Sequence, residues 1–187
     1  MNTQIVTGSI ADLAQKNHQS LAESFISCDV IVLVDVSGSM GRVDPGKVKT
    51  RYERACAALA NLQASNPGKV AIISFESSPL FCPAGVPPAP GGTTDLGRAL
   101  LFTQVADAVP GMRFVVISDG EPDNANEALN IARRYQNRID VIFVGDETDR
   151  DAIQFMNQLA TASGGKQITA DSAQIAETVQ FLLSSAT

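Results

Sequence analysis

The stretch "VIVLVDVSGSMGR" (residues 30–42) begins as an unbroken aliphatic run and ends in small and polar residues. A continuous apolar run is typical of a strand that helices cover on both faces of a parallel sheet. Asp35, Ser37 and Ser39 follow this run directly. A phosphate loop, an acylated or phosphorylated active site and a site for a hard metal ion all place such groups at a strand end. The stretch therefore indicates a buried strand and leaves three chemistries open.

The rest of the chain alternates between aliphatic runs and helical patterns. Such alternation predicts an α/β fold: a doubly wound, mostly parallel open sheet with helices on both faces and right-handed crossovers. The further strands are expected at 70–75, 114–118, 141–144 and 166–170, and helices at 47–63, 95–108 and 124–135, after Thr148 and from Asp171.

Three details of these helices are specific enough to test. Val48 is the first inward-facing residue of the helix expected at 47–63. Asp123 is placed to cap the helix at 124–135, because aspartate side chains accept hydrogen bonds from the first backbone amides of a helix. Thr148 and Asp151 resemble a capping box, with an aspartate in place of the usual glutamate.

Two segments lie outside the alternation. Residues 9–26 predict an amphipathic helix with His18 on its apolar side, and we treat 1–27 as an N-terminal extension of a domain at 28–187. The segment 77–92 is rich in proline and glycine, which preclude a regular helix. It is expected to form a short edge strand around Leu80 and Phe81 and then a loop.

Composition and charge exclude several function classes. The net charge of −6 and pI of about 4.7 disfavour nucleic-acid binding, because an acidic surface repels phosphates. No run approaches the roughly 20 apolar residues that a membrane span needs, and the first residues lack signal-peptide features. Three cysteines without a C-x-x-C pair favour a reducing compartment. We therefore expect a cytoplasmic protein without a membrane span.

Polar residues gather at the predicted carboxyl edge of the sheet. "GGTTDLG" (91–97) precedes a helix, and Asp119 follows the strand at 114–118. In open α/β sheets, binding groups collect at this edge, near the point where the strand order reverses. An all-oxygen set of carboxylates and hydroxyls suits Mg²⁺ or Mn²⁺.

These motifs resemble those of the von Willebrand factor A domain family, in a compact bacterial-type form. "DVSGSM" matches its D-x-S-x-S signature, "TDLG" its threonine setting at Thr94, and "VVISDGEP" its aspartate at Asp119. The resemblance covers about 28–187 and implies a complete metal-ion-dependent adhesion site. It implies Ser37, Ser39 and Thr94 as hydroxyl ligands of Mg²⁺, with Mn²⁺ or Ca²⁺ as alternatives, and Asp35 and Asp119 as groups that act mostly through water or orient the hydroxyls.

The resemblance also implies a function. A divalent ion held by neutral hydroxyls keeps charge with which to bind an Asp or Glu of a protein partner. We therefore expect a protein-binding module without catalysis of its own, acting alone or, like some bacterial relatives, beside an ATPase. The alternative is a phosphoryl-transfer or phosphatase-type enzyme that uses Asp35 and Mg²⁺. Phosphate-loop motifs are missing from the sequence, and His18 is the only histidine, which disfavours nucleotide binding and a serine hydrolase.

Overall fold

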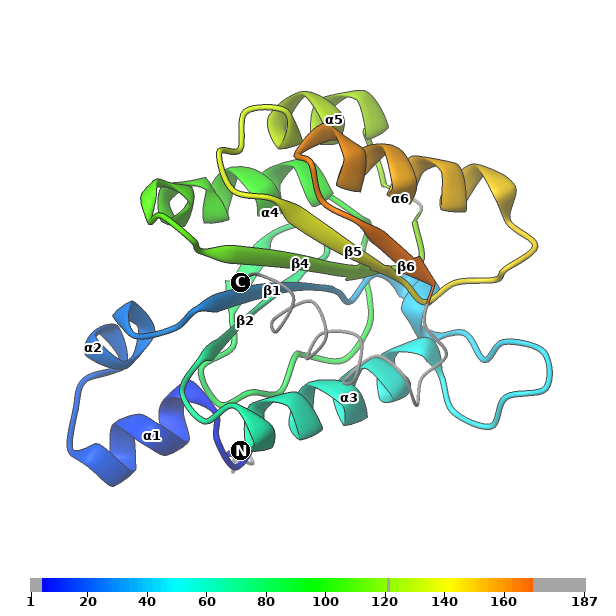
Figure 1. Cartoon of the computed structure of the whole chain (residues 1–187). Coiled ribbons are helices and arrows are strands. Elements are labelled where there is room, and N and C mark those ends of the chain that lie inside the picture. Colours follow the sequence, from blue (N-terminus) through cyan, green and yellow to red (C-terminus); the bar gives the residue numbers. More distant parts are fainter. Residues whose placement is uncertain (1–4, 121, 170–187) are drawn as a thin grey trace.

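The sheet has six strands in the order β3-β2-β1-β4-β5-β6 (Figure 1). The structure is a computed structural model and describes residues 5–120 and 122–169. All neighbouring strands pair in parallel except β3, which pairs antiparallel with β2 at one edge. The strands are β1 (Val30–Asp35), β2 (Val70–Phe75), β3 (Pro79–Phe81), β4 (Arg113–Ser118), β5 (Ile139–Phe143) and β6 (Gln167–Thr169). The predicted α/β class, its doubly wound sheet and the edge strand at Leu80 and Phe81 are confirmed.

Strand β1 lies at the centre of the sheet and is buried along its whole length. It pairs in register with β2 on one side and β4 on the other, so Val34 lies opposite both Ser74 and Ile117. The chain runs outward from β1 to β3 and then returns to β4, which places the reversal of strand order between β1 and β4. Parallel strands in register end at the same edge, so Asp35 and Ser118 finish side by side.

Helices cover both faces of the sheet (Figure 1). One face packs against α4 (Leu96–Thr103), α5 (Ala125–Ala132) and α6 (Arg150–Ala162), and the 3-10 helix η2 (Gln104–Ala108) follows α4. The other face packs against α3 (Arg51–Ser65) and the buried Met40 of the 3-10 helix η1 (Gly38–Gly41). Each fully buried large side chain contributes about 1.5–3 kcal/mol of hydrophobic stabilisation. The two cores therefore hold the loops at the carboxyl edge on a rigid support.

The N-terminal segment forms two helices, which corrects the prediction of one helix at 9–26. Helix α1 (Ile10–Asn17) ends at His18, whose φ of 54° is left-handed, and α2 (Leu21–Ile26) begins after Ser20 with a capping box. His18 is exposed and does not lie on a buried apolar face. The periodicity of apolar residues continues across this break, which is why it did not reveal the break.

Three helix starts also differ from the predictions. Helix α3 begins at Arg51 behind a capping box of Thr50 and Glu53, which leaves Val48 95% exposed. The cap of α5 is Asn124 rather than Asp123, and the cap of α6 is Asp149 rather than Thr148. In α5 and α6 a polar residue next to the predicted cap makes the capping bond, and all three predicted helices are present. The helix predicted from Asp171 lies outside the described residues.

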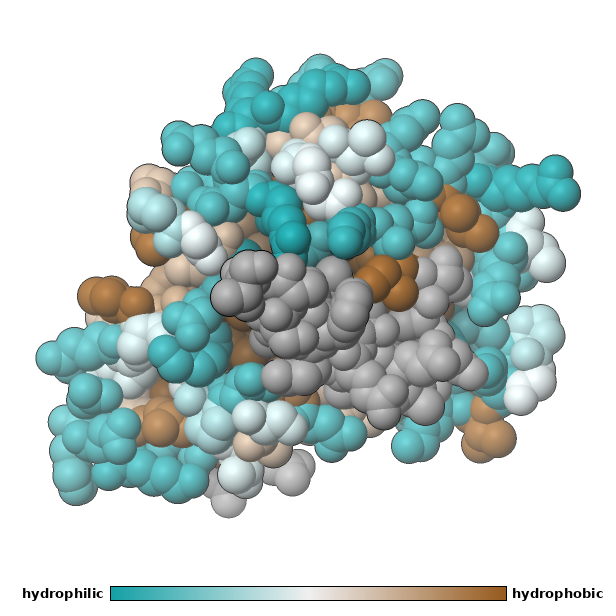
Figure 2. Space-filling view, viewed as in Figure 1, coloured by the Kyte–Doolittle hydropathy of each residue, from teal (hydrophilic) through white to brown (hydrophobic). Residues whose placement is uncertain are grey.

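On the face drawn in Figure 2, most of the described residues are hydrophilic (teal), with apolar residues scattered between them. In residues 5–120 and 122–169, no helix is long and apolar enough to cross a membrane.

Candidate functional site

Asp35 is the buried centre of the carboxyl edge. It ends β1 and is 0% exposed. Its Oδ1 accepts a hydrogen bond from the Ser37 amide at 2.8 Å, and its Oδ2 accepts one from Ser118 Oγ at 2.6 Å. Burial raises the pKa of Asp35 to about 6, although both hydrogen bonds favour the charged form. With both oxygens engaged, Asp35 holds the loop after β1 in place.

Ser37 and Ser39 present their hydroxyls together. The two Oγ atoms lie 3.0 Å apart, with Ser37 buried and Ser39 half-buried. Both residues belong to the turn that leads into η1, which the fully buried Met40 anchors in the core. The neighbouring Gly38 amide donates to the carbonyl of Gly92 at 3.4 Å. The turn after β1 therefore lies directly against the loop that carries Thr94.

Thr94 is the buried threonine of this loop. It is 6% exposed, while Thr93 is exposed. The Thr94 amide donates to Asp123 Oδ1 at 3.1 Å, and the Asp123 amide donates to the Thr94 carbonyl at 3.0 Å. Asp123 thus joins the Thr94 loop to the segment after β4 instead of capping α5. Asp95 caps α4, because its Oδ1 accepts a hydrogen bond from the Arg98 amide at 2.9 Å.

Asp119 carries a buried oxygen that lacks a partner. It follows β4 and is 2% exposed. Its Oδ2 accepts a bond from Arg51 Nη1 at 2.8 Å, and its Oδ1 has no hydrogen-bond partner among the described residues. The turn requires Gly120, whose φ is 88° and whose missing Cβ would lie 3.0 Å from Ala152. A buried carboxylate oxygen without a donor is costly, and a cation would satisfy it.

The donor set fits a hard cation held mainly by neutral groups. Within residues 5–120 and 122–169, no cluster of three or more His, Cys, Asp or Glu could hold a metal. The candidate set is of another kind, because hydroxyls provide three of its five members: Ser37, Ser39, Thr94, Asp35 and Asp119. Oxygen donors of this type suit Mg²⁺. The hydrogen bonds above connect the loops that carry these five residues, and their binding of a metal stays a prediction.

Sequence reasoning missed four residues that shape this edge. Ser118 donates to Asp35 and accepts a bond from the Gly120 amide at 3.1 Å. Arg51, Arg54 and Asp44 form ion pairs that reach Asp119. For Ser118 a signal existed, since it is the polar residue that ends an aliphatic strand. The arginines lie on a helix in a pattern that a solvated face would share.

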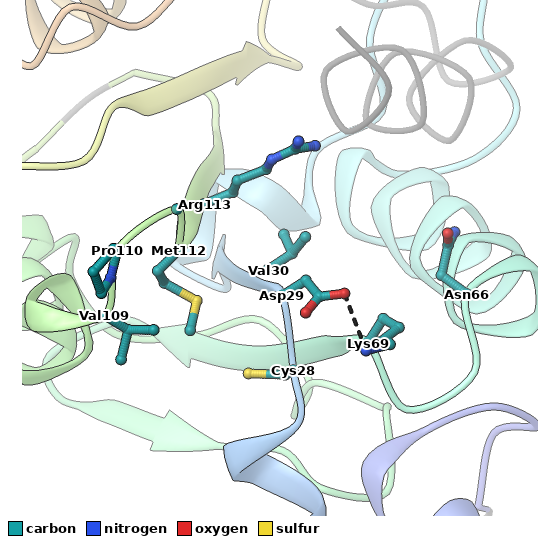
Figure 3. Close-up of a pocket in the computed structure, with 10 residues that line it drawn as sticks. Cys28, Asp29, Val30, Asn66, Lys69, Val109, Pro110, Met112 and Arg113 are labelled. Carbon is teal, nitrogen blue, oxygen red and sulfur yellow. Dashed lines mark ion pairs between the residues drawn. The ribbon is translucent and has the colours of Figure 1, made fainter. Parts of the chain in front are cut away.

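A hollow lies at the opposite, amino end of the sheet (Figure 3). It is a cavity of about 420 Å³ at the starts of β1 and β4, where Asp29 and Lys69 form an ion pair at 3.2 Å. Burial raises the pKa of the Cys28 thiol to about 11, so this thiol is protonated and unreactive near neutral pH. The cavity therefore has no activated nucleophile at Cys28. It lies at the amino end of the sheet, whereas the candidate metal residues lie at the carboxyl edge.

The fold and the edge geometry define an α/β domain with an oxygen-rich site where its strand order reverses. The model of the von Willebrand factor type A domain matches residues 30–148. The chain therefore belongs to the von Willebrand factor type A domain family.

Solved structures agree at the level of the fold. An aerotolerance-related membrane protein from Bacteroides fragilis superposes with a TM-score of 0.61 at 18% identity, covering 82% of this chain and 96% of that chain. BatB from Bacteroides thetaiotaomicron gives 0.55 at 17% identity, covering 84% and 100%. The PilB minor pilin from Streptococcus sanguinis gives 0.58 at 12% identity, covering 83% and 60%. Comparison with curated protein sequences gave no significant match.

Proposed function

We propose that this domain binds a divalent cation, Mg²⁺ in the first place, and uses it to bind an Asp or Glu of a protein partner. In this proposal Ser37, Ser39 and Thr94 hold the ion through their hydroxyls. Asp35 and Asp119 orient these hydroxyls or act through water. The observation that carries the proposal is the buried, unpartnered Oδ1 of Asp119 at the edge where the two serine hydroxyls meet.

The donor chemistry supports binding of a carboxylate. Neutral hydroxyls donate lone pairs without cancelling charge, so a bound ion would supply an electrophilic position for a further anionic ligand. Both oxygens of Asp35, a charged residue beside the proposed ion, already accept hydrogen bonds from the Ser37 amide and the Ser118 hydroxyl. The carboxylate thus holds the Ser37 backbone and the Ser118 side chain, and its oxygens face the protein.

The same hydrogen bonds support a binding role over phosphoryl transfer. A nucleophilic aspartate needs an oxygen that can reach the phosphorus atom. Asp35 is 0% exposed and both of its oxygens accept hydrogen bonds, so an attack would first break one of them. We therefore propose a module without catalysis of its own, with the enzyme as the alternative that the experiments must address.

The loop 77–92 is proposed as part of the rim that a partner meets. Helix α3 holds it in place, since Tyr52 Oη donates to the Pro87 carbonyl at 2.7 Å and Gln63 Nε2 to the Gly85 carbonyl at 3.1 Å. Leu80 and Val86 are 55% and 40% exposed. A fixed loop with exposed apolar side chains suits a binding rim. A cytoplasmic location and a complex with an ATPase stay predictions.

The first experiment tests the ion. Mg²⁺ is titrated calorimetrically into the wild type, into a Ser37→Ala/Ser39→Ala variant and into a Ser65→Ala control, which changes an exposed serine at the end of α3. We expect one site in the wild type and the control, and its loss in the double variant. Equal binding by all three proteins would refute the assignment of the site.

The second experiment tests the carboxylate. An array of peptides, each with one Asp or Glu, is probed with the domain in Mg²⁺ or in EDTA, beside the matching Asn and Gln peptides. Binding that needs both Mg²⁺ and the acid is the expected result. Incubation with acetyl phosphate and intact-mass measurement tests the enzyme alternative, and a stable phosphoryl adduct on Asp35 would contradict the binding proposal.

A further inference from the structure

A buried network of four charged side chains joins helix α3 to the candidate metal site. Arg51 bonds Asp44 Oδ1 through Nε and Nη2, at 2.8 Å each, and bonds Asp119 Oδ2 through Nη1 at 2.8 Å. Arg54 Nη2 pairs with the other oxygen of Asp44. The side chains of Arg51 and Asp119 are 8% and 0% exposed. Two cations and two anions are thus buried together, and one of the anions belongs to the candidate site.

Arg51 bonds one of the two carboxylate oxygens of Asp119 and leaves the other without a bond to it. The planar guanidinium fixes the direction of its bonds, as a flexible lysine would not. Because Oδ2 faces Arg51, Oδ1 is the oxygen left for the candidate ion, and this buried atom has no hydrogen-bond partner among residues 5–120 and 122–169. The positive charge of Arg51 also offsets the negative charge of Asp119. A metal at this edge would therefore meet less than one full negative charge from Asp119.

We propose that Arg51 is a positioning residue of the metal site: it holds Asp119 by Oδ2, limits this carboxylate to one oxygen and weakens its attraction for the ion. This inference rests on the proposed function, because it concerns the same ion. Its consequence is that the ion keeps more of its charge for the carboxylate of a partner. Asp44 tunes the effect, because it competes with Asp119 for the guanidinium of Arg51.

The position of Asp44 extends the inference to the segment 42–50. This segment leaves the body of the domain between η1 and α3 at the carboxyl edge (Figure 1). Within it Val43 is 51% and Val48 95% exposed, while the Asp44 side chain is only 10% exposed and pairs with both arginines. A partner that moves this segment would therefore change how firmly Arg51 holds Asp119.

Calorimetric titration of Mg²⁺ into three variants tests the inference. Arg51→Met removes the positive charge that offsets Asp119 and frees its Oδ2, so Mg²⁺ should bind about tenfold more tightly. Asp44→Asn removes the anion that competes with Asp119 for Arg51. Arg51 then offsets the charge of Asp119 more fully, so Mg²⁺ should bind several-fold more weakly. Arg54→Met is a graded comparison: its guanidinium pairs with Asp44 and not with Asp119, so its effect reaches Asp119 only through Asp44 and should change the Mg²⁺ affinity by less than about twofold. Thermal unfolding monitors the fold of each variant.

The opposite signs separate positioning from structural support. A merely structural network would lower the stability of all three variants and shift their Mg²⁺ affinity in one direction or not at all, and that result would overturn the inference. If Arg51→Met does not fold, unchanged affinity in Asp44→Asn overturns it equally. The wild type could bind Mg²⁺ and the Ser37→Ala/Ser39→Ala variant could fail to bind it, while Arg51→Met and Asp44→Asn leave the affinity unchanged. That result would overturn this inference alone. Absence of Mg²⁺ binding in the wild type would overturn the proposed function together with it.

Discussion

Replacing Ser118 by alanine removes a buried side-chain donor to Asp35 Oδ2. The Ser118 Oγ atom donates to this oxygen at 2.6 Å and accepts a bond from the Gly120 amide at 3.1 Å. The hydroxyl lies in the interior, since Ser118 is 2% exposed. The substitution therefore leaves a buried carboxylate oxygen and a buried amide without their partner.

The magnitude follows from these two losses. A hydrogen bond to a charged group contributes about 1.5–3 kcal/mol, and a buried group left unsatisfied costs about 1–3 kcal/mol. Because the two losses overlap, we expect the free energy of unfolding to fall by about 2–4 kcal/mol at neutral pH.

The loss should depend on pH, with a sign set by Asp35. Burial raises the pKa of Asp35 from 3.8 to about 6, so its contribution to stability is largest below pH 4 and is lost as the pH rises through 6. Removing the Ser118 donor disfavours the charged form further and raises this pKa again. Each unit by which the pKa rises corresponds to about 1.4 kcal/mol of lost stabilisation of the charged form. The destabilisation should therefore be larger at about pH 7.5 than at about pH 5.

Urea unfolding in EDTA, followed by circular dichroism at both pH values, measures this effect. Ser74→Ala is the matched control, because Ser74 is a 1% exposed strand serine whose Oγ makes only long bonds to neutral groups: it donates to the Leu80 carbonyl and accepts from Cys82 Sγ, at 3.4 Å each. A double-mutant cycle of Ser118→Ala with Asp35→Asn should give a coupling energy of about 1 kcal/mol or more. The reasoning fails if Ser118→Ala costs no more than Ser74→Ala, or if its cost is the same at both pH values.

Three further outcomes are expected. Protons compete with Mg²⁺ for Asp35, whose pKa is about 6, so the dissociation constant should rise about fourfold between pH 7.5 and 5.5; a pH-independent titration would contradict the role of Asp35. Thr94→Val keeps the shape and the backbone bonds of Thr94 but removes its hydroxyl, and should weaken Mg²⁺ binding by about tenfold, whereas Thr94→Ser should not. Asp107→Ala removes a carboxylate that accepts bonds from the amides of Gln136 and Asn137 at 2.7 and 2.8 Å; chemical unfolding should show a loss of about 2–3 kcal/mol, with Mg²⁺ affinity unchanged in the calorimeter.

The sheet could be predicted because its strands carry their signal locally. Val30 to Val34 form a continuous apolar run, and the segments 70–75, 114–118 and 141–144 repeat that pattern between helices. The edge that collects Asp35 and Asp119 follows from this alternation, since parallel strands end together. The choice of Thr94 over Thr93 came from the family motif, and the structure buries Thr94 and exposes Thr93.

The interactions around the site could not be predicted, because they join residues that are far apart in the chain. Arg51 and Asp119 are 68 positions apart, and Asp35 and Ser118 are 83 apart. Asp123 shows how a local rule fails: it stands one residue before the helix cap, yet its carboxylate accepts a bond from the Thr94 amide across 29 positions. Tertiary partners outcompete a local preference that is worth only about 1 kcal/mol.

The break of the N-terminal helix has a similar origin. The left-handed conformation of His18 leaves no mark on the spacing of apolar residues. Ser20 and Glu23 do form a capping box in the sequence order that the rule requires, so this second helix start was readable from the chain. The apolar periodicity that spans the break masked it.

A crystal structure of the domain grown with Mn²⁺ tests the central claim most directly, through the anomalous scattering of the ion. The claim requires a single anomalous peak within coordination distance of the hydroxyls of Ser37, Ser39 and Thr94, with Asp119 Oδ1 facing it. A peak at other residues, or bound Mn²⁺ that leaves these three hydroxyls without contact, would contradict it.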